Sequence, residues 1–572
     1  MTNDSVVSKS SGKYLLVAFL ITVVFNGIVL VHFHNRFWWP PDEGVYAHIA
    51  ERVMKGEVLN SDVEEIHTGY LNLFHSVVFR IFGVRLVSLR YPLAAVALIQ
   101  SCLVFLILAK HNVWLGVMGA IGSTSLGVIQ YLNPTPNWYC LLLSTLVAFC
   151  LTYIPTERRG RIELVGLLTG LVFLLRQITG VFVAMSVLTY LLAEKRDDTH
   201  GSGTILSKTV FAVMLLGSIT YLMVATEQIG LLLFGIWPIV ILIQALFYSR
   251  TSNKRTLRIV IRMALGCVGA AVPILIYHLA HRSLWTFFDD TVLRALHVAK
   301  FSYLKLQNYG EQVVYALQNV FAFGSFATVI NGVYWTILPL IATVVGVASV
   351  LAFRRSRELI AVGSLPIIAV FYGQVALLQQ IPIYLFYSLP LSFAALLWLS
   401  RNGRKKTVLG LGLVTAFLVC VSLYYQAAQP IGRTLGGIIR GDRIGLVPAT
   451  TLPRTGLWID PESLRVYTEV VQTIQAQTQP NETIFVIANN PEFYFLAERR
   501  NPFRFWNTAV GVRNEPEAAA VMNILANQPP RVVVIDPQDR NNTEYSNAMI
   551  AYVRSTYTLI NTVSNFEIYR AP

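Results

Sequence analysis

Residues 14–46 read YLLVAFLITVVFNGIVLVHFHNRFWWPPDEGVY, and they combine a membrane signal with a cluster of polar and aromatic residues. The first part, 14–32, is apolar and long enough to cross the roughly 30 Å hydrocarbon core of a bilayer as a helix. It is too long for the core of a signal peptide, and no A-x-A cleavage signal follows, so we expect it to be retained. The second part places two adjacent carboxylates just beyond the end of that span.

Similar apolar runs recur along the chain, which has 572 residues, of which 54% are hydrophobic and only 13% charged. Soluble domains carry about 25% charged residues, so a soluble fold is excluded. We predict a polytopic α-helical membrane protein of about 13 transmembrane helices. The predicted spans are 14–32, 91–109, 113–131, 138–154, 164–175, 180–192, 209–226, 230–248, 259–280, 327–352, 359–378, 383–399 and 407–426.

The net charge is +14, and most of the basic residues lie in short loops between the apolar runs. Membrane topology accounts for this charge, so we expect no nucleic-acid partner. Basic residues concentrate in alternate short loops, which predicts that these loops are cytoplasmic. They are Arg158, Arg159, Arg161, Lys195, Arg196, Lys208, Arg250, Lys254, Arg255, Arg258, Arg354, Arg355, Arg357, Arg401, Arg404, Lys405 and Lys406. The opposite loops 133–137 and 379–382 carry no Lys or Arg. The N-terminus is therefore expected in the cytoplasm and the C-terminal tail outside.

The chain divides into three predicted regions. Residues 1–426 form the transmembrane domain, with long external loops at 33–90 and 281–325, and residues 427–458 form a linker. Residues 459–572 alternate strand-like and amphipathic segments, which predicts a small soluble extracytoplasmic α/β domain. The expected strands are 483–488, 531–536 and 566–571, and the expected helices are 461–477, 514–527 and 545–555. In the first loop, 43–56 and 71–84 are expected to be amphipathic helices, the latter lying in the membrane interface.

Asp42 and Glu43 open the amphipathic segment 43–56. Taken locally, Asp42 is an N-cap and Glu43 complements the positive end of that helix. The surrounding motif supports a second interpretation. Pro-Asp-Glu-x-x-Tyr soon after a first span resembles the glycosyltransferase C-fold superfamily, in the branch of protein O-mannosyltransferases and the bacterial aminoarabinose-to-lipid-A transferase. Further similar landmarks are Ile81-Phe82-Gly83, Leu89-Arg90-Tyr91-Pro92, the glycine-spaced run from Gly166 to Arg176-Gln177, and Ile383-Tyr384-Leu385-Phe386-Tyr387-Ser388-Leu389-Pro390.

The resemblance implies a glycosyltransferase that moves a sugar, hexose or pentose, from a polyprenyl-monophosphate carrier to a lipid, glycan or protein acceptor. The reaction would take place on the non-cytoplasmic face, presumed to be that of a bacterial inner (plasma) membrane, and would invert the anomeric centre. Asp42 is then the general base, Glu43 a supporting acid or substrate contact, and Tyr46 a substrate contact. Two departures concern the donor head group: His67 stands where the family has Lys, and no Arg precedes Tyr384.

Donor phosphate binding requires cations, since a departing phosphate is stabilised by positive charge. Arg176 lies within the apolar stretch 164–192, where an ionisable residue is a functional candidate. Its alternative role is an arginine that snorkels to the interface. Arg80, Arg85 and His67 are further donor candidates. Tyr384 and Tyr387 line the sugar site or, equally, form an aromatic belt.

No cofactor follows firmly from the sequence. A divalent metal held by Asp42, His34 or His67 is conceivable, although their spacing is not diagnostic. Two other functions fit the topology. One is a polysaccharide polymerase or ligase that uses a polyprenyl-diphosphate donor, and the other is a flippase or transporter of lipid-linked sugars. Transporters usually show internal repeats, which this sequence lacks.

Overall fold

The computed structural model describes residues 9–194, 203–225, 228–298, 308–322, 324–379, 381–427 and 445–572. Most of the predicted linker, residues 428–444, and part of the second external loop, residues 299–307, lie outside this range. Within it, ten helical segments are long and apolar enough to cross a membrane. They are α1 (Lys9–Phe33), α4 (Leu86–Ala109), α5 with η1 (Val113–Ser125, Val128–Gln130), α6 (Pro136–Tyr153), α9 (Ile205–Ala225), η2 with α11 (Leu231–Gly235, Ile236–Tyr248), α12 (Asn253–Ala280), α16 (Phe326–Ser356), α19 (Pro382–Leu399) and α20 with η6 (Lys405–Val421, Ser422–Gln426).

Three predicted spans are shorter than the others. They correspond to α7 (Arg161–Leu175), α8 (Gln177–Ala193) and the group α17 (Leu359–Val362), α18 (Ser364–Tyr372) and η5 (Gly373–Leu377). At 1.5 Å per residue, α7 rises about 22 Å, which is less than a bilayer core of about 30 Å. We therefore expect the turn between α7 and α8 to be recessed below the ends of the longer helices.

The break between α7 and α8 falls at Arg176, as the interrupted apolar stretch predicts. The backbone of Arg176 is extended, with φ −155° and ψ 107°. This residue is both the C-cap of α7 and the N-cap of α8. The two helices then fold back on each other. A Cβ added at Gly180 would lie 2.2 Å from the Cα of Phe173, so this tight return requires glycine.

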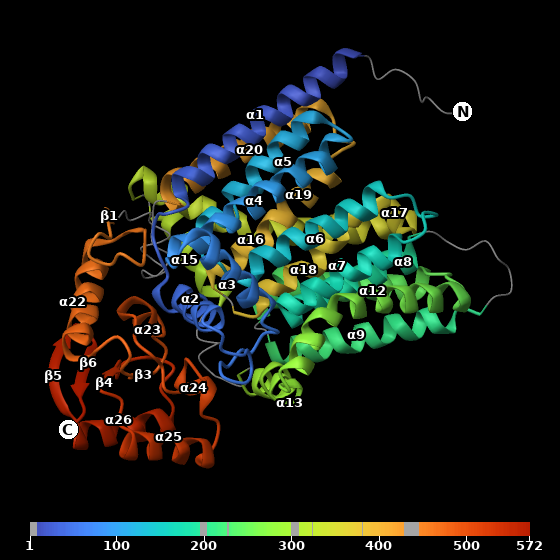
Figure 1. Ribbon diagram of the computed structural model, residues 1–572. Coiled ribbons are helices and arrows are strands. Elements are labelled where there is room, and N and C mark those ends of the chain that lie inside the picture. Colours follow the sequence, from blue (N-terminus) through green and yellow to red (C-terminus); the bar gives the residue numbers. More distant parts are fainter. Residues whose placement is uncertain are drawn as a thin grey trace, which may run out of the picture.

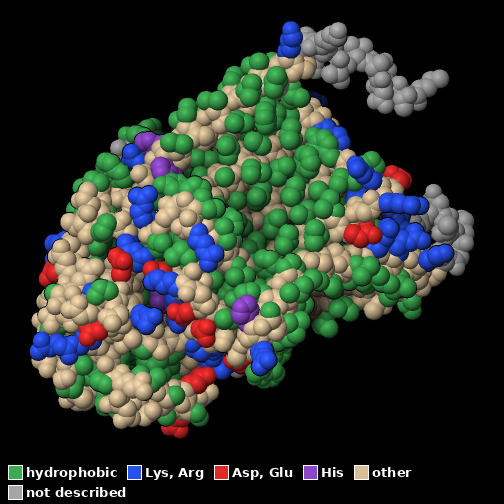
Figure 2. All heavy atoms as spheres, viewed as in Figure 1, with side chains coloured by type: hydrophobic (Ala, Val, Ile, Leu, Met, Phe, Trp, Pro, Cys, Tyr) green, Lys and Arg blue, Asp and Glu red, His purple; other side chains and the backbone are tan. Residues whose placement is uncertain are grey.

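The helices form a tilted bundle (Figure 1). Figure 2 shows a broad band of hydrophobic side chains over the bundle, with Lys and Arg gathered at one end of it. Large apolar side chains exposed on the helices include Ile28, Val213, Leu265, Leu351 and Leu409. An apolar belt of this kind, bounded by charges, indicates an integral membrane protein.

The other end of the bundle carries the elements that surround the site. They are α2 (Pro40–Met54), α3 (Tyr70–Phe82), α10 (Gln228–Gly230), α13 (Leu284–Phe288), η3 (Asp289–Arg294), α14 (Ala295–Val298) and α15 (Tyr309–Phe321). Both helices expected in the first loop are present. Helix α2 lies against α3 and against the C-terminal domain (Figure 1).

The C-terminal part contains a four-stranded sheet of order β3-β4-β6-β5, in which β3 and β4 are parallel and the other pairs antiparallel. Its elements are β1 (Val447–Pro448), β2 (Trp458–Ile459), α22 (Pro461–Gln477), β3 (Ile484–Ile487), α23 (Glu492–Ala497), α24 (Thr508–Gly511), α25 (Glu515–Asn527), β4 (Val532–Ile535), α26 (Glu544–Thr556), β5 (Thr558–Val563) and β6 (Phe566–Arg570). The three expected strands and three expected helices are present. Strand β5 was not predicted because it is an edge strand whose side chains are mostly exposed or half-buried, which leaves only a weak apolar pattern.

This domain is docked onto the bundle through the first external loop. The backbone of Trp458 exchanges hydrogen bonds with Phe37 and Asn35, at 2.7 and 2.8 Å. One buried apolar cluster contains residues of both parts, among them Trp38 and Val470. The docking therefore fixes the segment that precedes Asp42.

Candidate active site

Helix α2 begins with the Pro-Pro step, which presets the helical backbone at its first two positions. The N-cap residue is Trp39, and the side chain of Asp42 forms no capping hydrogen bond to this helix. The backbone N–H of Trp39 instead donates to Oε2 of Glu43, at 3.2 Å. The capping interpretation of Asp42 is therefore wrong, and its carboxylate is available for other contacts.

The carboxylate of Asp42 faces the loop that joins α5 to α6. Tyr131 donates its hydroxyl hydrogen to Oδ2 of Asp42, and the side-chain amide of Asn133 donates to the same oxygen at 3.3 Å. Asn133 also donates to the Tyr131 hydroxyl, at 2.8 Å. In the described part of the chain nothing is hydrogen-bonded to Oδ1, and the Asp42 side chain is exposed. One carboxylate oxygen is thus oriented while the other is open.

Three effects set the proton affinity of Asp42. The protein that surrounds the carboxyl raises its pKa above the ordinary value, and the hydrogen bond from Tyr131 and the positive charge of Arg540 lower it. A carboxylate whose pKa is moved upward toward neutrality is a better proton acceptor than a fully solvated one.

Arg176, at the break between α7 and α8, is oriented by two side chains. Its guanidinium donates to the side-chain oxygen of Asn137 and, at 3.1 Å, to the hydroxyl of Tyr384. The guanidinium carbon also lies 5.2 Å from the centre of the Tyr384 ring. These contacts hold a half-buried cation at the recessed turn.

The charge-free loop Asn133–Asn137 connects the acid to the cation. Asn133 contacts Asp42 at one end of the loop and Asn137 contacts Arg176 at the other. Between them Thr135 donates to the hydroxyl of Tyr387, at 3.2 Å. We call these residues the acid–cation cluster: Asp42, Tyr131, Asn133, Thr135, Asn137, Arg176, Tyr384 and Tyr387.

Sequence reasoning missed this loop because it looked for charges, and the loop has none. The available signal was a run of three polar side chains, Asn133, Thr135 and Asn137, in a short segment of the expected external side. In the structure the first two lie in the loop and Asn137 lies in the first turn of α6.

Tyr46, one turn after Asp42 on α2, lies within the field of both charges. Burial raises the pKa of its phenol well above the ordinary value, and Asp42 and Glu65 raise it further while Arg176 lowers it. The hydroxyl of Tyr46 therefore lies in the same environment as Asp42 and Arg176.

A recess of about 210 Å³ opens beside Tyr46. Polar side chains line one part of it and the ends of α7 and α6 line another; its residues are Tyr46, Glu65, His67, Gly69, Tyr70, Leu71, Asn72, Pro136, Leu174 and Leu175. The ring of His67 contacts Glu65 Oε1 at 3.0 Å, and Asn72 donates to Glu65 Oε2. Glu65, which sequence reasoning did not select, is thus a buried carboxylate in the wall of this recess.

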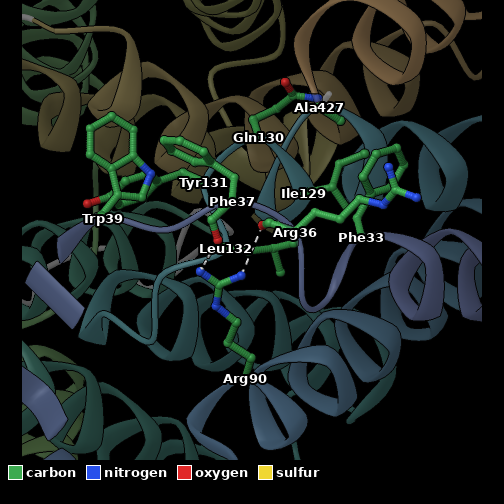
Figure 3. Close-up of a pocket in the computed structure, with 10 residues that line it drawn as sticks. All are labelled: Phe33, Arg36, Phe37, Trp39, Arg90, Ile129, Gln130, Tyr131, Leu132 and Ala427. Carbon is green, nitrogen blue, oxygen red and sulfur yellow. Dashed lines mark hydrogen bonds between the residues drawn. The ribbon is translucent and has the colours of Figure 1, made fainter. Parts of the chain in front are cut away.

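Glu43 lies in a different environment from Asp42. It is buried and forms a bidentate ion pair with Arg90, with distances of 2.7 and 2.9 Å. Arg90 also donates to the carbonyls of Arg36 and Phe37, at 3.0 and 2.6 Å (Figure 3). The pair fixes the segment before α2, so Glu43 positions Asp42 and is turned away from the acid–cation cluster.

A second pocket, of about 290 Å³, lies on this side of the site (Figure 3). Aromatic residues and two arginines contribute most of its lining, which consists of Phe33, Arg36, Phe37, Trp39, Arg90, Ile129, Gln130, Tyr131, Leu132 and Ala427. Tyr131 belongs to this wall and to the acid–cation cluster, so the pocket adjoins Asp42 through one side chain.

The remaining predicted residues are not brought into the cluster. Arg80 is exposed and donates to the carbonyl of Met54, at 3.3 Å, and Arg85 is exposed at the N-cap of α4. His34 contacts the carbonyl of Val31, at 2.7 Å. Across the residues that the structure describes, no group of three His, Cys, Asp or Glu side chains is arranged to hold a metal. Asp42, His34 and His67 thus do not form a common ligand set.

No family model and no curated protein matches the chain. Among solved structures, it is similar to ArnT from Cupriavidus metallidurans bound to undecaprenyl phosphate, with 13% identity and a TM-score of 0.37 over 97% of this chain and 98% of that one. It is also similar to the Archaeoglobus fulgidus oligosaccharyltransferase in complex with Zn and sulfate. That comparison has 13% identity and a TM-score of 0.43 over 96% of this chain and 73% of that one.

TM-scores below 0.5 do not establish a common function, so the function has to be inferred from the residues of the site itself.

Proposed function

We propose that this protein is a membrane glycosyltransferase that moves a sugar from a polyprenyl-monophosphate donor to a hydroxyl acceptor on the non-cytoplasmic face. The observation that supports this most is the acid–cation cluster: one short loop contacts Asp42 at Asn133 and Arg176 at Asn137. A proton acceptor and a phosphate-binding cation are the two groups that sugar transfer from a lipid phosphate needs.

The reaction divides between the two ends of the cluster. Asp42 removes the proton of the acceptor hydroxyl, and the resulting oxygen forms a bond to the anomeric carbon of the donor. The bond from that carbon to the phosphate oxygen breaks, and its electron pair leaves with the polyprenyl phosphate. Arg176 stabilises the charge on that leaving group, and attack opposite the departing phosphate inverts the anomeric centre.

The recess beside Tyr46 suits the donor for two reasons. Its wall includes the apolar side chains of Leu174 and Leu175 at the recessed end of α7, next to Arg176. A polyprenyl chain that lies in the outer leaflet reaches a recessed turn without leaving hydrocarbon. The polar wall with Glu65 and His67 supplies hydrogen-bonding groups for sugar hydroxyls.

The side of the membrane follows from charge. The basic short loops lie at the end of the bundle remote from Asp42, and the positive-inside rule assigns that end to the cytoplasm. On this assignment the acid–cation cluster and the C-terminal domain are extracytoplasmic. The acceptor, whether lipid, glycan or protein, then meets the donor outside the cytoplasm.

The test uses the purified full-length protein in nanodiscs with radiolabelled polyprenyl-phosphate hexoses and pentoses and a membrane extract as acceptor source. We expect transfer by the wild type and none by Asp42→Asn, with both proteins showing the same melting temperature. Transfer by Asp42→Asn at the wild-type rate contradicts the assignment of the base. Translocation of an intact donor with no product supports a flippase, and use of a diphosphate donor alone supports a polymerase or ligase.

A further inference from the structure

The C-terminal domain packs directly on the first turn of α2, which carries Asp42. A Cβ placed on Gly44 would lie 2.6 Å from both the Cβ and the backbone nitrogen of Glu492, the first residue of α23. The ring of Tyr467 contacts that of Trp38, with centres 4.8 Å apart. The loop that follows β3 is thus seated on the helix of the proposed base (Figure 1).

The loop that follows β4 lies next to it. Parallel strands β3 and β4 end at the same edge of the sheet, so both loops emerge on the side of α2. The backbone N–H of Asn489, in the first loop, donates to Oδ2 of Asp539, in the second, at 3.2 Å. Arg540 is the next residue.

The second loop is held in shape by its own polar side chains. Oδ1 of Asp539 accepts from the backbone and side chain of Asn541, at 2.8 and 2.6 Å. The side chain of Asn542 donates to the carbonyl of Asp536, and Asn565 donates to its carboxylate. These bonds order the backbone on both sides of Arg540, so the residue is carried on a well-defined loop next to the one seated on α2.

We infer that the C-terminal domain is part of the active site, and that Arg540 is a positioning residue that extends its positive charge to the carboxylate of Asp42. This rests on the proposed function for the role of Asp42, but the juxtaposition of the two residues does not. In the structure the positive charge of Arg540 lowers the pKa of Asp42, opposing the upward effect of the protein that surrounds the carboxyl. The base is thereby kept ionised at a pH at which it accepts a proton.

From the bundle, the hydrogen bond of Tyr131 also lowers the pKa of Asp42. Asp42 in turn raises the pKa of its neighbours Glu43 and Tyr46 on α2. Arg540 differs because it comes from the soluble domain, 498 positions further along the chain. The catalytic unit then includes both parts of the molecule, and the sheet serves to carry the loop with this arginine.

The kinetic experiment compares Arg540→Gln, Arg540→Lys and the matched control Arg570→Gln, which removes the same charge from the end of β6. We expect the acid limb of the kcat/KM profile to move to higher pH in Arg540→Gln, to stay near the wild type in Arg540→Lys, and to be unchanged in the control. Identical profiles in all four proteins overturn the inference while the wild-type transfer still upholds the proposed function.

A second measurement does not depend on catalysis. The five native cysteines are replaced, and Asp42→Cys is combined with Arg540→Cys or, as a control, with Arg570→Cys. We expect a short bifunctional maleimide to join the first pair and not the second. Failure to join the first pair, or equal reaction of both, overturns the juxtaposition whatever the protein transfers.

Discussion

Tyr131 donates its phenolic hydrogen to Asp42, and the same phenol accepts a hydrogen bond from Asn133. The hydrogen bond stabilises the ionised form of the carboxylate, so it lowers the pKa of Asp42 against the effect of the surrounding protein. The base lies on α2 and its orienting residue lies in the loop between α5 and α6, so this loop controls the ionisation of Asp42.

Replacing Tyr131 by Phe removes this hydrogen bond while preserving the ring. The pKa of Asp42 then rises, so a smaller fraction of the base is ionised at a given acidic pH, and the acid limb of the kcat/KM profile moves to higher pH. Tyr139→Phe is the matched control, because its buried hydroxyl has no hydrogen-bond partner among the residues that the structure describes. A Tyr131→Phe profile that coincides with the wild type would show that this bond does not tune the base.

Replacing Arg176 by Ala removes the cation of the acid–cation cluster. A charged hydrogen bond contributes about 1.5 to 3 kcal/mol, so we expect undecaprenyl phosphate to bind roughly 10- to 100-fold more weakly. Binding is measured with the labelled lipid in nanodiscs. Undecaprenol, which lacks the phosphate, should bind the wild type and Arg176→Ala alike, whereas an equal loss for both lipids would indicate a collapsed recess instead of a lost phosphate contact.

The two charged members of the cluster were predictable from sequence because each breaks a local pattern. Asp42 follows a rigid Pro-Pro step just past the first span, and Arg176 interrupts an apolar stretch. The ends of the three long helices in the C-terminal domain, α22, α25 and α26, were also predicted to within about one residue, whereas the short helices α23 and α24 were not predicted.

The residues that were missed depend on long-range contacts. Asn133 and Asn137 look like ordinary turn residues, and their role appears only when α2 and α7 lie on either side of them. The sequence also did not distinguish exposed from buried arginines in the first loop. Arg80 and Arg85 are exposed, whereas Arg90 is buried against Glu43. That difference is set by tertiary packing.

The pair between Glu43 and Arg90 should matter for stability more than for chemistry. Glu43→Gln leaves a buried guanidinium without its counter-charge, and breaking such a pair costs about 3 to 5 kcal/mol. Chemical denaturation in detergent measures the loss. The control, Glu462→Gln, removes an exposed partner of Arg465 and should leave the unfolding curve unchanged. A Glu43→Gln protein as stable as this control, yet inactive in transfer, would instead give Glu43 a direct role in the reaction.

Replacing Gly44 by Ala tests whether the contact between α2 and the C-terminal domain is needed for activity. Alanine at this position would place its Cβ 2.6 Å from the backbone nitrogen of Glu492, and a backbone atom cannot move aside as a flexible side chain does. Helices α2 and α23 would have to separate, at an overpacking cost of about 1 to 3 kcal/mol. We expect Gly44→Ala to lower the melting temperature and to reduce transfer together, because the first turn of α2 carries Asp42. Gly27→Ala is the control, since in the described part of the chain no heavy atom outside the neighbouring backbone of its own helix lies within 4 Å of the added Cβ. Normal transfer by Gly44→Ala, with proteolysis showing that the C-terminal domain has come away from the bundle, would mean that the bundle alone performs the reaction.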